Sequence, residues 1–201
     1  LLDTFDYVKK NNCKLHLMGL VSDGGVHSHI NHLEAICSAA AEHNVPNVFI
    51  HAFTDGRDTD PKSGIGYIKE LESHLKKTTG KIASVGGRYY AMDRDKRWER
   101  IKLAYHLLVN GEGGKVKSAE EGIKKSYDEG VTDEFIKPVA ISDINENPMA
   151  KITDGDAVLC FNFRTDRCRE ITKVFTQSDM PEHGMKTLNL HYVTMTTYDH
   201  S

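Results

Sequence analysis

Short apolar runs rich in β-branched residues alternate along the chain with longer segments in which apolar residues recur at helical spacing. The runs predict strands over 14–20, 47–53, 81–87, 157–163 and 188–195. The periodic segments predict helices over 30–43, 61–77, 96–109, 119–129 and 166–175, and the chain also begins within an apparent helix. This alternation predicts an α/β fold with three layers, in which helices flank a mostly parallel sheet.

Two segments lack a clear period, the Gly-rich stretch 110–118 and the polar stretch 142–157, and both are predicted to be loops. Neither has the composition of a domain linker, so 201 residues are expected to form a single domain. Pro61 suits the first turn of the helix predicted over 61–77, because proline has no amide hydrogen and the first turn needs none.

The charge balance argues against a general affinity for polyanions. A formal net charge of -3 provides no basic field for nucleic acid or anionic membrane, and we expect neither as a partner. No apolar run approaches the roughly 20 residues that span a bilayer. The four cysteines are scattered without a C-x-x-C pair, which favours a reducing, cytoplasmic location.

Both ends of the chain are unusual for a complete protein. It starts inside the apparent helix without an initiator Met and stops just after a strand-like run. We therefore expect it to be part of a longer polypeptide.

Polar loops follow four of the predicted strands: "VSDGGVHSH", "TDGRDTD", "GGRYYAMDRD" and "RTDR". In an open parallel sheet, ligands bind in the crevice outside the carboxyl ends of the strands, so these loops should converge there. The side chains that they would bring together are His27, His29, Asp23, Asp55, Arg57, Asp58, Arg88, Asp93, Arg94, Arg164 and Arg167.

Five of these residues are arginines, which would make a strong local anion site in a chain of net negative charge. Guanidinium groups bind phosphate and carboxylate through paired hydrogen bonds, so a small phosphorylated carboxylic acid is the expected ligand. Arg164 and Arg167 are three apart and should project from one face as the chain enters a helix, whereas Arg169 should face elsewhere.

Simpler interpretations remain open for several of these residues. Arg57 could belong to a turn held only by aspartate side chains. His27 and His29 could form a metal-binding pair, or one could contact a ligand while the other caps or packs. The sequence has no phosphate-binding P-loop, no dinucleotide-binding glycine turn and no nucleophile elbow, so it predicts binding more readily than bond cleavage.

Four motifs in order, "GLVSDGGVHSH", "HAFTDGRDTDP", "GRYYAMDRDKRWER" and "FNFRTDR", resemble those of cofactor-independent (2,3-bisphosphoglycerate-independent) phosphoglycerate mutases, and the resemblance covers nearly the whole chain. Members of that family combine a metal-binding phosphatase-like domain, of the alkaline phosphatase superfamily, with an inserted phosphotransferase domain. This chain is similar to the inserted, substrate-binding domain alone.

The resemblance implies a role for individual residues. The family's substrate-binding positions match His27, Arg57, Asp58, Arg88, Arg94, Arg164 and Arg167. Asp58 is the candidate proton acceptor. The phosphorylated serine, the two manganese ions and a substrate-binding lysine of the family belong to the other domain, so no metal site is expected in this chain.

Two hypotheses follow. In the first, the chain is the substrate-binding part of a monomeric glycolytic enzyme that interconverts 3-phosphoglycerate and 2-phosphoglycerate through the serine of the absent domain, and the isolated part is inactive. In the second, it is a non-catalytic module that binds phosphorylated sugar acids. Flanking metal-binding motifs and an upstream serine in the coding sequence would favour the first hypothesis.

Overall fold

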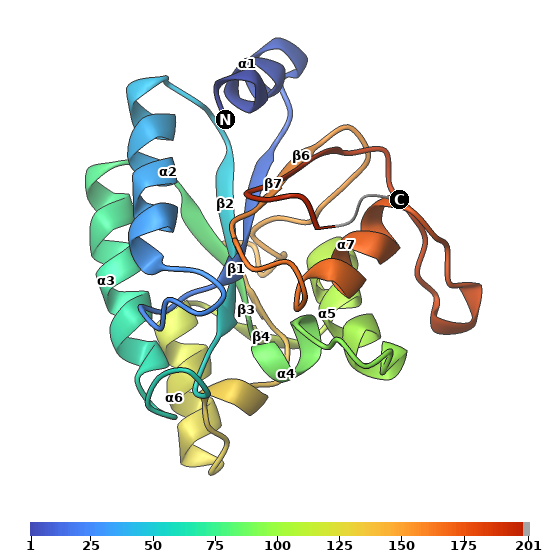
Figure 1. Ribbon diagram of the computed structural model, residues 1–201. Coiled ribbons are helices and arrows are strands. Elements are labelled where there is room, and N and C mark those ends of the chain that lie inside the picture. Colours follow the sequence, from blue (N-terminus) through green and yellow to red (C-terminus); the bar gives the residue numbers. More distant parts are fainter. Residues whose placement is uncertain (199–201) are drawn as a thin grey trace.

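The computed structural model describes residues 1–198 and contains a central sheet of seven strands with helices on both faces (Figure 1). The strands are β1 (Leu15–Leu20), β2 (Val48–Thr54), β3 (Lys81–Gly87), β4 (Gly114–Val116), β5 (Val139–Ile141), β6 (Ala157–Cys160) and β7 (His191–Thr194). The α-helices are α1 (Leu2–Asn11), α2 (Ile30–Glu42), α3 (Gly64–Lys77), α4 (Arg88–Ala91), α5 (Trp98–Asn110), α6 (Ala119–Asp128) and α7 (Arg169–Thr176). Two short 3₁₀ helices are η1 (Asp133–Phe135) and η2 (Pro181–His183).

The strand order is β4-β5-β3-β2-β1-β6-β7, with β1 near the centre. The pairs from β3 through β2, β1 and β6 to β7 are all parallel, which confirms a mostly parallel sheet. The strand order changes direction at β1, because β2 and β3 extend the sheet on one side and β6 and β7 on the other. The carboxyl ends of β1 and β6 therefore mark the switch point at which α/β proteins bind ligands.

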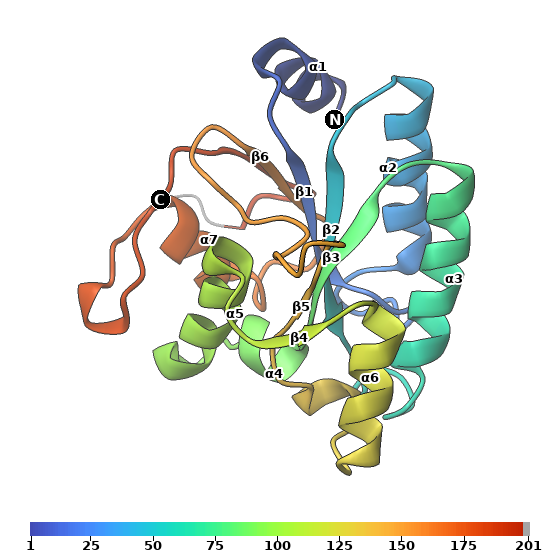
Figure 2. The same ribbon diagram turned by 180° about the vertical axis from the view of Figure 1, so that it is seen from behind.

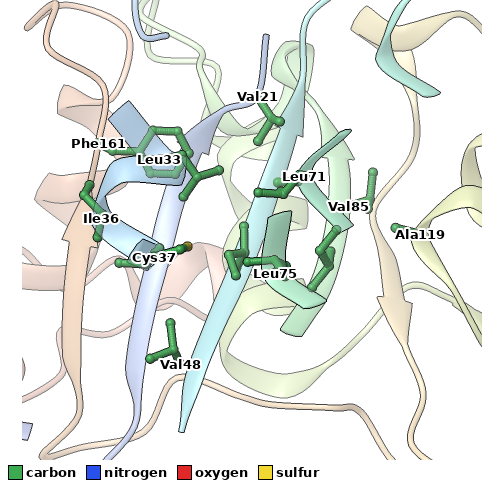
Figure 3. Packing of buried hydrophobic residues seen from close by; sticks show 14 of the residues in the cluster. Val21, Leu33, Ile36, Cys37, Val48, Leu71, Leu75, Val85, Ala119 and Phe161 are labelled. Carbon is green, nitrogen blue, oxygen red and sulfur yellow. The ribbon is translucent and has the colours of Figure 1, made fainter. Parts of the chain in front are cut away.

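The helices bury the two faces of this sheet in separate hydrophobic clusters. Helices α2, α3 and α6 cover one face, and α4, α5 and α7 cover the other (Figure 2). On the first face, Leu33 and Cys37 of α2 and Leu71 and Leu75 of α3 pack against the strands (Figure 3). Every residue of β1 is buried, as expected for a strand covered on both faces. The expected three-layer, single-domain α/β architecture is confirmed.

A hydrogen-bonded chain of buried polar side chains begins at Asp156, the residue before β6, and crosses β1, β2 and β3. Asp156 Oδ2 lies 2.9 Å from His16 Nε2, and His16 Nδ1 lies 2.8 Å from His51 Nε2. His51 Nδ1 in turn lies 2.7 Å from Ser84 Oγ. Burial lowers the pKa of His16 and holds that of His51 well below its usual value, so both rings are neutral at pH 7.

Several predicted elements differ from the structure. The strand expected over 157–163 ends at Cys160. The Phe161 amide still donates to the Met18 carbonyl of β1, but the Phe163 amide donates to the His27 carbonyl in the loop that follows β1. The strand expected over 188–195 is only residues 191–194. The Gly-rich stretch 110–118, expected to be a loop, contains β4, and β5 runs antiparallel to β3. Both strands have only three residues, too few to produce a periodic signal.

Three helices also begin later than predicted, and for α3 the cause is a tertiary contact. The helix begins at Gly64 rather than residue 61, because the buried Asp133 carboxylate accepts a 2.7 Å hydrogen bond from the Gly64 amide. Pro61 precedes the helix in a turn. Helix α5 occupies 98–110 rather than 96–109, and α7 occupies 169–176 rather than 166–175.

Candidate functional site

The loops that follow β1 and β6 are joined by main-chain hydrogen bonds. The His27 carbonyl accepts from the Phe163 amide at 2.8 Å and from the Arg164 amide at 3.3 Å. Residue 27 and the "RTDR" motif, which begins at residue 164, are thereby placed side by side at the carboxyl end of the sheet. The convergence predicted for these two loops is confirmed.

The loops that follow β1, β2 and β3 are joined by Asp55, which is 1% exposed. Its carboxylate accepts hydrogen bonds from the Ser22 hydroxyl at 2.6 Å, the Arg57 amide at 3.1 Å and the Asp58 amide at 3.0 Å. It also accepts one from Arg88 Nη1 at 2.9 Å. Burial alone would raise the pKa of Asp55, but these hydrogen bonds lower it below its usual value. Asp55 is therefore ionised and organises the site.

Arg88, the first residue of α4, is 3% exposed and forms ion pairs with two aspartates. Besides Asp55, it donates a 2.7 Å hydrogen bond from Nη1 to Asp58 Oδ2. The close approach of Gly87 to the main chain of η1 leads into this helix, since a Cβ on Gly87 would lie 2.2 Å from the Glu134 carbonyl oxygen. Only glycine fits at position 87, and this close contact fixes the position at which α4 and the buried Arg88 begin.

His27 lies between two carboxylates and is itself almost fully buried. Its Nε2 is 3.8 Å from Asp58 Oδ2, and its Nδ1 is 3.7 Å from Asp166 Oδ1. Burial and the positive charge of Arg88 lower the pKa of His27 to about 4, although the two aspartates act in the opposite direction. The imidazole is neutral at pH 7 and can accept a proton or a hydrogen bond.

A cavity of about 350 Å³ opens beside these residues, and we call it the arginine cavity. Six arginines and three carboxylates line it, so positive charge predominates. The lining residues are Arg57, Arg88, Tyr89, Met92, Asp93, Arg94, Asp95, Arg97, Arg100, Glu134, Phe135 and Arg167. The size and the excess of guanidinium groups suit a small anion.

Arg167 is the residue of this cavity whose charge is least compensated. Burial and the neighbouring Arg94, Arg88 and Arg57 lower its pKa below the usual value. Its Nη1 donates only a long, 3.4 Å hydrogen bond to the Met92 carbonyl. The buried Nε has no hydrogen-bond partner among the described residues. An anion in the cavity would provide both the missing charge and the missing acceptor.

Arg94 and Arg164 share a carboxylate at the edge of the cavity. Asp166 Oδ2 accepts a 2.8 Å hydrogen bond from Arg94 Nη1, and Asp166 Oδ1 lies 3.2 Å from Arg164 Nε. Both arginine side chains are close to half exposed. Neither Arg164 nor Asp166 lines the arginine cavity, but Asp166 links Arg164 to Arg94, which does.

The prediction that Arg164 and Arg167 share one face of a helix is wrong. Residues 164–168 form a bend and a turn, and α7 starts only at Arg169. The expectation that Arg169 faces elsewhere is confirmed, because its Nε donates to the Tyr198 carbonyl at 3.1 Å. It lines a neighbouring cavity of about 710 Å³ that also touches Arg94 and Asp166.

Three site residues were missed by sequence reasoning. Arg97 and Arg100 line the cavity and pair with the buried Asp93 carboxylate at 3.2 and 3.5 Å. Arg100 also stacks on the Tyr89 ring, 3.8 Å from its centre. Their signal was present in "MDRDKRWER", where arginines recur every three residues after Asp93. Asp166 lies within "RTDR" beside Arg167, where an aspartate is also typical of a turn and so gives no separate signal.

The alternative in which His27 and His29 bind a metal together is not supported by their positions. His29 caps α2, because its Nδ1 accepts a 3.2 Å hydrogen bond from the Asn31 amide. Within residues 1–198, no group of three or more His, Cys, Asp or Glu side chains is placed to hold a metal ion.

The chain is similar to known proteins over nearly its whole length. A family model described as "BPG-independent PGAM N-terminus" matches residues 1–200. The 2,3-bisphosphoglycerate-independent phosphoglycerate mutase of Flavobacterium johnsoniae is 56% identical over 199 residues, which cover 99% of this chain and 39% of that protein. The corresponding protein of Bacteroides fragilis is 55% identical over 202 residues, covering 100% of this chain and 39% of its own length.

A solved structure has the same fold. The phosphoglycerate mutase of Leishmania mexicana, crystallised at low cobalt concentration, superposes with a TM-score of 0.91 at 35% identity. The match covers 98% of this chain and 38% of that one. The chain thus spans 39% of the length of the curated relatives it matches. Because the family model covers nearly the whole sequence, the chain belongs to the family of the N-terminal domain of BPG-independent phosphoglycerate mutases.

Proposed function

We propose that this chain is the substrate-binding domain of a cofactor-independent phosphoglycerate mutase, which converts 3-phosphoglycerate to 2-phosphoglycerate in glycolysis and gluconeogenesis. The observation that carries the proposal is Arg167, whose buried Nε has no acceptor within residues 1–198 and whose charge is repelled by three other arginines. A phosphorylated carboxylic acid carries the charge and the acceptor oxygens that would complete this arrangement.

In this proposal the phosphoryl group leaves phosphoglycerate for a serine oxygen on the remaining, phosphatase-like part of the polypeptide. The serine gives up its proton, and the oxygen released on glycerate takes one. Glycerate then turns, and its other hydroxyl takes the phosphoryl group back. The manganese ions of the family would be held by that remaining part and would stabilise charge on the transferring group.

The residues of this chain would hold the substrate while it turns. Arg57, Arg94 and Arg167 face the arginine cavity and would bind the phosphate and carboxylate, and Arg164 would join them from its edge. Arg88 keeps Asp58 and Asp55 in place, with one guanidinium nitrogen 2.7 and 2.9 Å from their oxygens. Neutral His27 would orient a hydroxyl, and Asp58 would accept its proton.

The structure also bears on the setting of the enzyme. None of the helices between residues 1 and 198 is long and apolar enough to cross a membrane. All four cysteines are free thiols, as is usual in a reducing compartment. The free thiols favour a cytoplasmic location, which the proposal includes together with a monomeric state.

A direct test compares the full-length polypeptide with this chain alone. The full-length protein should convert 3-phosphoglycerate to 2-phosphoglycerate in the presence of manganese, and the isolated chain should not. Robust turnover by the chain alone would show that the serine and the metal site are not needed. A full-length protein that binds 3-phosphoglycerate in calorimetry but never isomerises it would favour a non-catalytic binding module instead.

A further inference from the structure

Two buried polar atoms face each other in the site without forming a hydrogen bond. They are His27 Nδ1 and Asp166 Oδ1, which lie 3.7 Å apart, beyond the range of a direct hydrogen bond. Neither has a hydrogen-bond partner among the described residues. Buried polar atoms normally have partners, so an unmade bond between two complementary groups indicates a second arrangement in which it forms.

Asp166 is held away from His27 by arginines. One oxygen accepts the 2.8 Å hydrogen bond from Arg94, and the other makes the 3.2 Å ion-pair contact with Arg164. Burial alone would raise the pKa of Asp166, but Arg94, Arg164 and His27 lower it below its usual value. The carboxylate is thus an anion that occupies the same guanidinium groups an anionic substrate needs.

We propose that Asp166 is a positioning residue that exchanges partners when substrate binds. The substrate's anionic oxygens take over Arg94 and Arg164, and the released Asp166 carboxylate accepts a hydrogen bond from His27 Nδ1. This inference rests on the proposed function, because it requires a phosphorylated acid in the arginine cavity. It adds a role for a residue that the resemblance does not assign.

The exchange would fix which nitrogen of His27 carries the proton. A neutral imidazole has one donor and one acceptor nitrogen, so donation from Nδ1 to Asp166 leaves Nε2 as the acceptor. Nε2 faces Asp58, 3.8 Å away, which is where the proposed reaction requires a group that can orient a hydroxyl. Binding at the arginines would then prepare the histidine for the next step.

The charged groups around His27 agree with this assignment. Arg88 and Arg164 disfavour a positive charge on the ring, whereas Asp58 and Asp166 favour it. When the substrate's own charge offsets Arg164, the influence of Asp166 on His27 increases. The ring remains neutral at pH 7, because burial is the largest of the effects that lower its pKa.

The kinetic test uses Asp166→Asn in the full-length polypeptide. The variant no longer competes with substrate for the two arginines, so KM for 3-phosphoglycerate should be unchanged or lower. Turnover should fall about 10- to 100-fold, by analogy with the loss seen when the partner that orients a metal-bound histidine is removed. Asp6→Asn is the matched control, because Asp6 lies on the exposed side of α1, at the opposite end of the sheet from α4 (Figure 1).

The second measurement needs no variant to fold. Nitrogen-15 NMR of the wild-type protein at pH 7.5 reports which nitrogen of His27 is protonated, with and without 3-phosphoglycerate. Saturable binding with a shift of the wild-type protein to the Nδ1-protonated form supports the exchange. Saturable binding with an unchanged tautomer overturns it while leaving the proposed function intact. No binding to the wild-type protein overturns the proposed function and this inference together.

Discussion

The Arg167 side chain is expected to lower the stability of the ligand-free protein and to strengthen substrate binding. Arg167→Ala should therefore change the two properties in opposite directions. In the ligand-free protein its charge is half-buried and repelled by Arg57, Arg88 and Arg94. The substitution removes that repulsion, and it sacrifices the 3.4 Å hydrogen bond to the Met92 carbonyl and the attraction of Asp166, the smallest of the influences on this charge. We therefore expect the melting temperature of the variant to equal or exceed that of the wild type.

The same substitution should weaken binding strongly. A hydrogen bond between a charged donor and an anion contributes about 1.5 to 3 kcal/mol. Loss of one such bond corresponds to a roughly 10- to 150-fold weaker affinity for 3-phosphoglycerate. The difference in affinity between the variant and the wild type should become smaller as salt is added. The reason is that salt screens the long-range part of the attraction, with a Debye length of about 8 Å at 0.15 M.

The assay is isothermal titration calorimetry with 3-phosphoglycerate on the full-length polypeptide, accompanied by thermal unfolding of the same samples. Arg169→Ala is the matched control, since Arg169 is only two positions away but lines the neighbouring cavity and bonds to the Tyr198 carbonyl. A variant at residue 167 that binds as tightly as the wild type would refute the reasoning. So would one that melts several degrees lower, because Arg167 would then be a structural residue.

Three further predictions concern stability. The neutral, buried pair His16 and His51 has a lowered pKa when folded, so the unfolded state takes up protons first as the pH falls below about 6.5. The free energy of unfolding should therefore be at its full value above that pH. Below it, the free energy should fall by about 1.4 kcal/mol per pH unit for each histidine that stays neutral in the folded state. Equal urea midpoints of unfolding at pH 7.5 and 5.5 would contradict this. Gly87→Ala should cost about 1 to 3 kcal/mol or more, because its Cβ would lie 2.2 Å from the Glu134 carbonyl oxygen. Gly66→Ala in α3, whose Cβ meets nothing within 4 Å, should be neutral or stabilising by up to about 1 kcal/mol in the same unfolding assay.

The main layers of the fold were predictable because they depend on local patterns. The strands over 15–20 and 48–54 are buried apolar runs, and the helices between them have clear apolar faces. Elements that depend on distant partners were not predictable. Strands β4 and β5 have three residues each and exist because they pair with each other and, through β5, with β3. The start of α3 depends on Asp133, which lies 69 residues further along the chain.

The sequence predicted which residues belong to the site better than it predicted how they are arranged. The rule that ligands bind at the carboxyl ends of parallel strands was enough to collect His27, Asp58 and Arg88. The sequence could not show that the main chain leaves the sheet at Phe161 and turns before α7, and this separates Arg164 from Arg167. It also could not show that Asp166 would be held between two arginines.

The pairing of β1 with β6 has a consequence for the chain during synthesis. Leu15 pairs with Ala157. One edge of the central strand therefore has no partner until the ribosome has added more than a hundred further residues. Until then β1 offers an edge of unpaired main-chain N–H and C=O groups in a mostly apolar strand, the kind of surface through which nascent chains aggregate. We expect ribosome-bound chains that stop before residue 157 to require a chaperone, and chains that include β6 to be released from it.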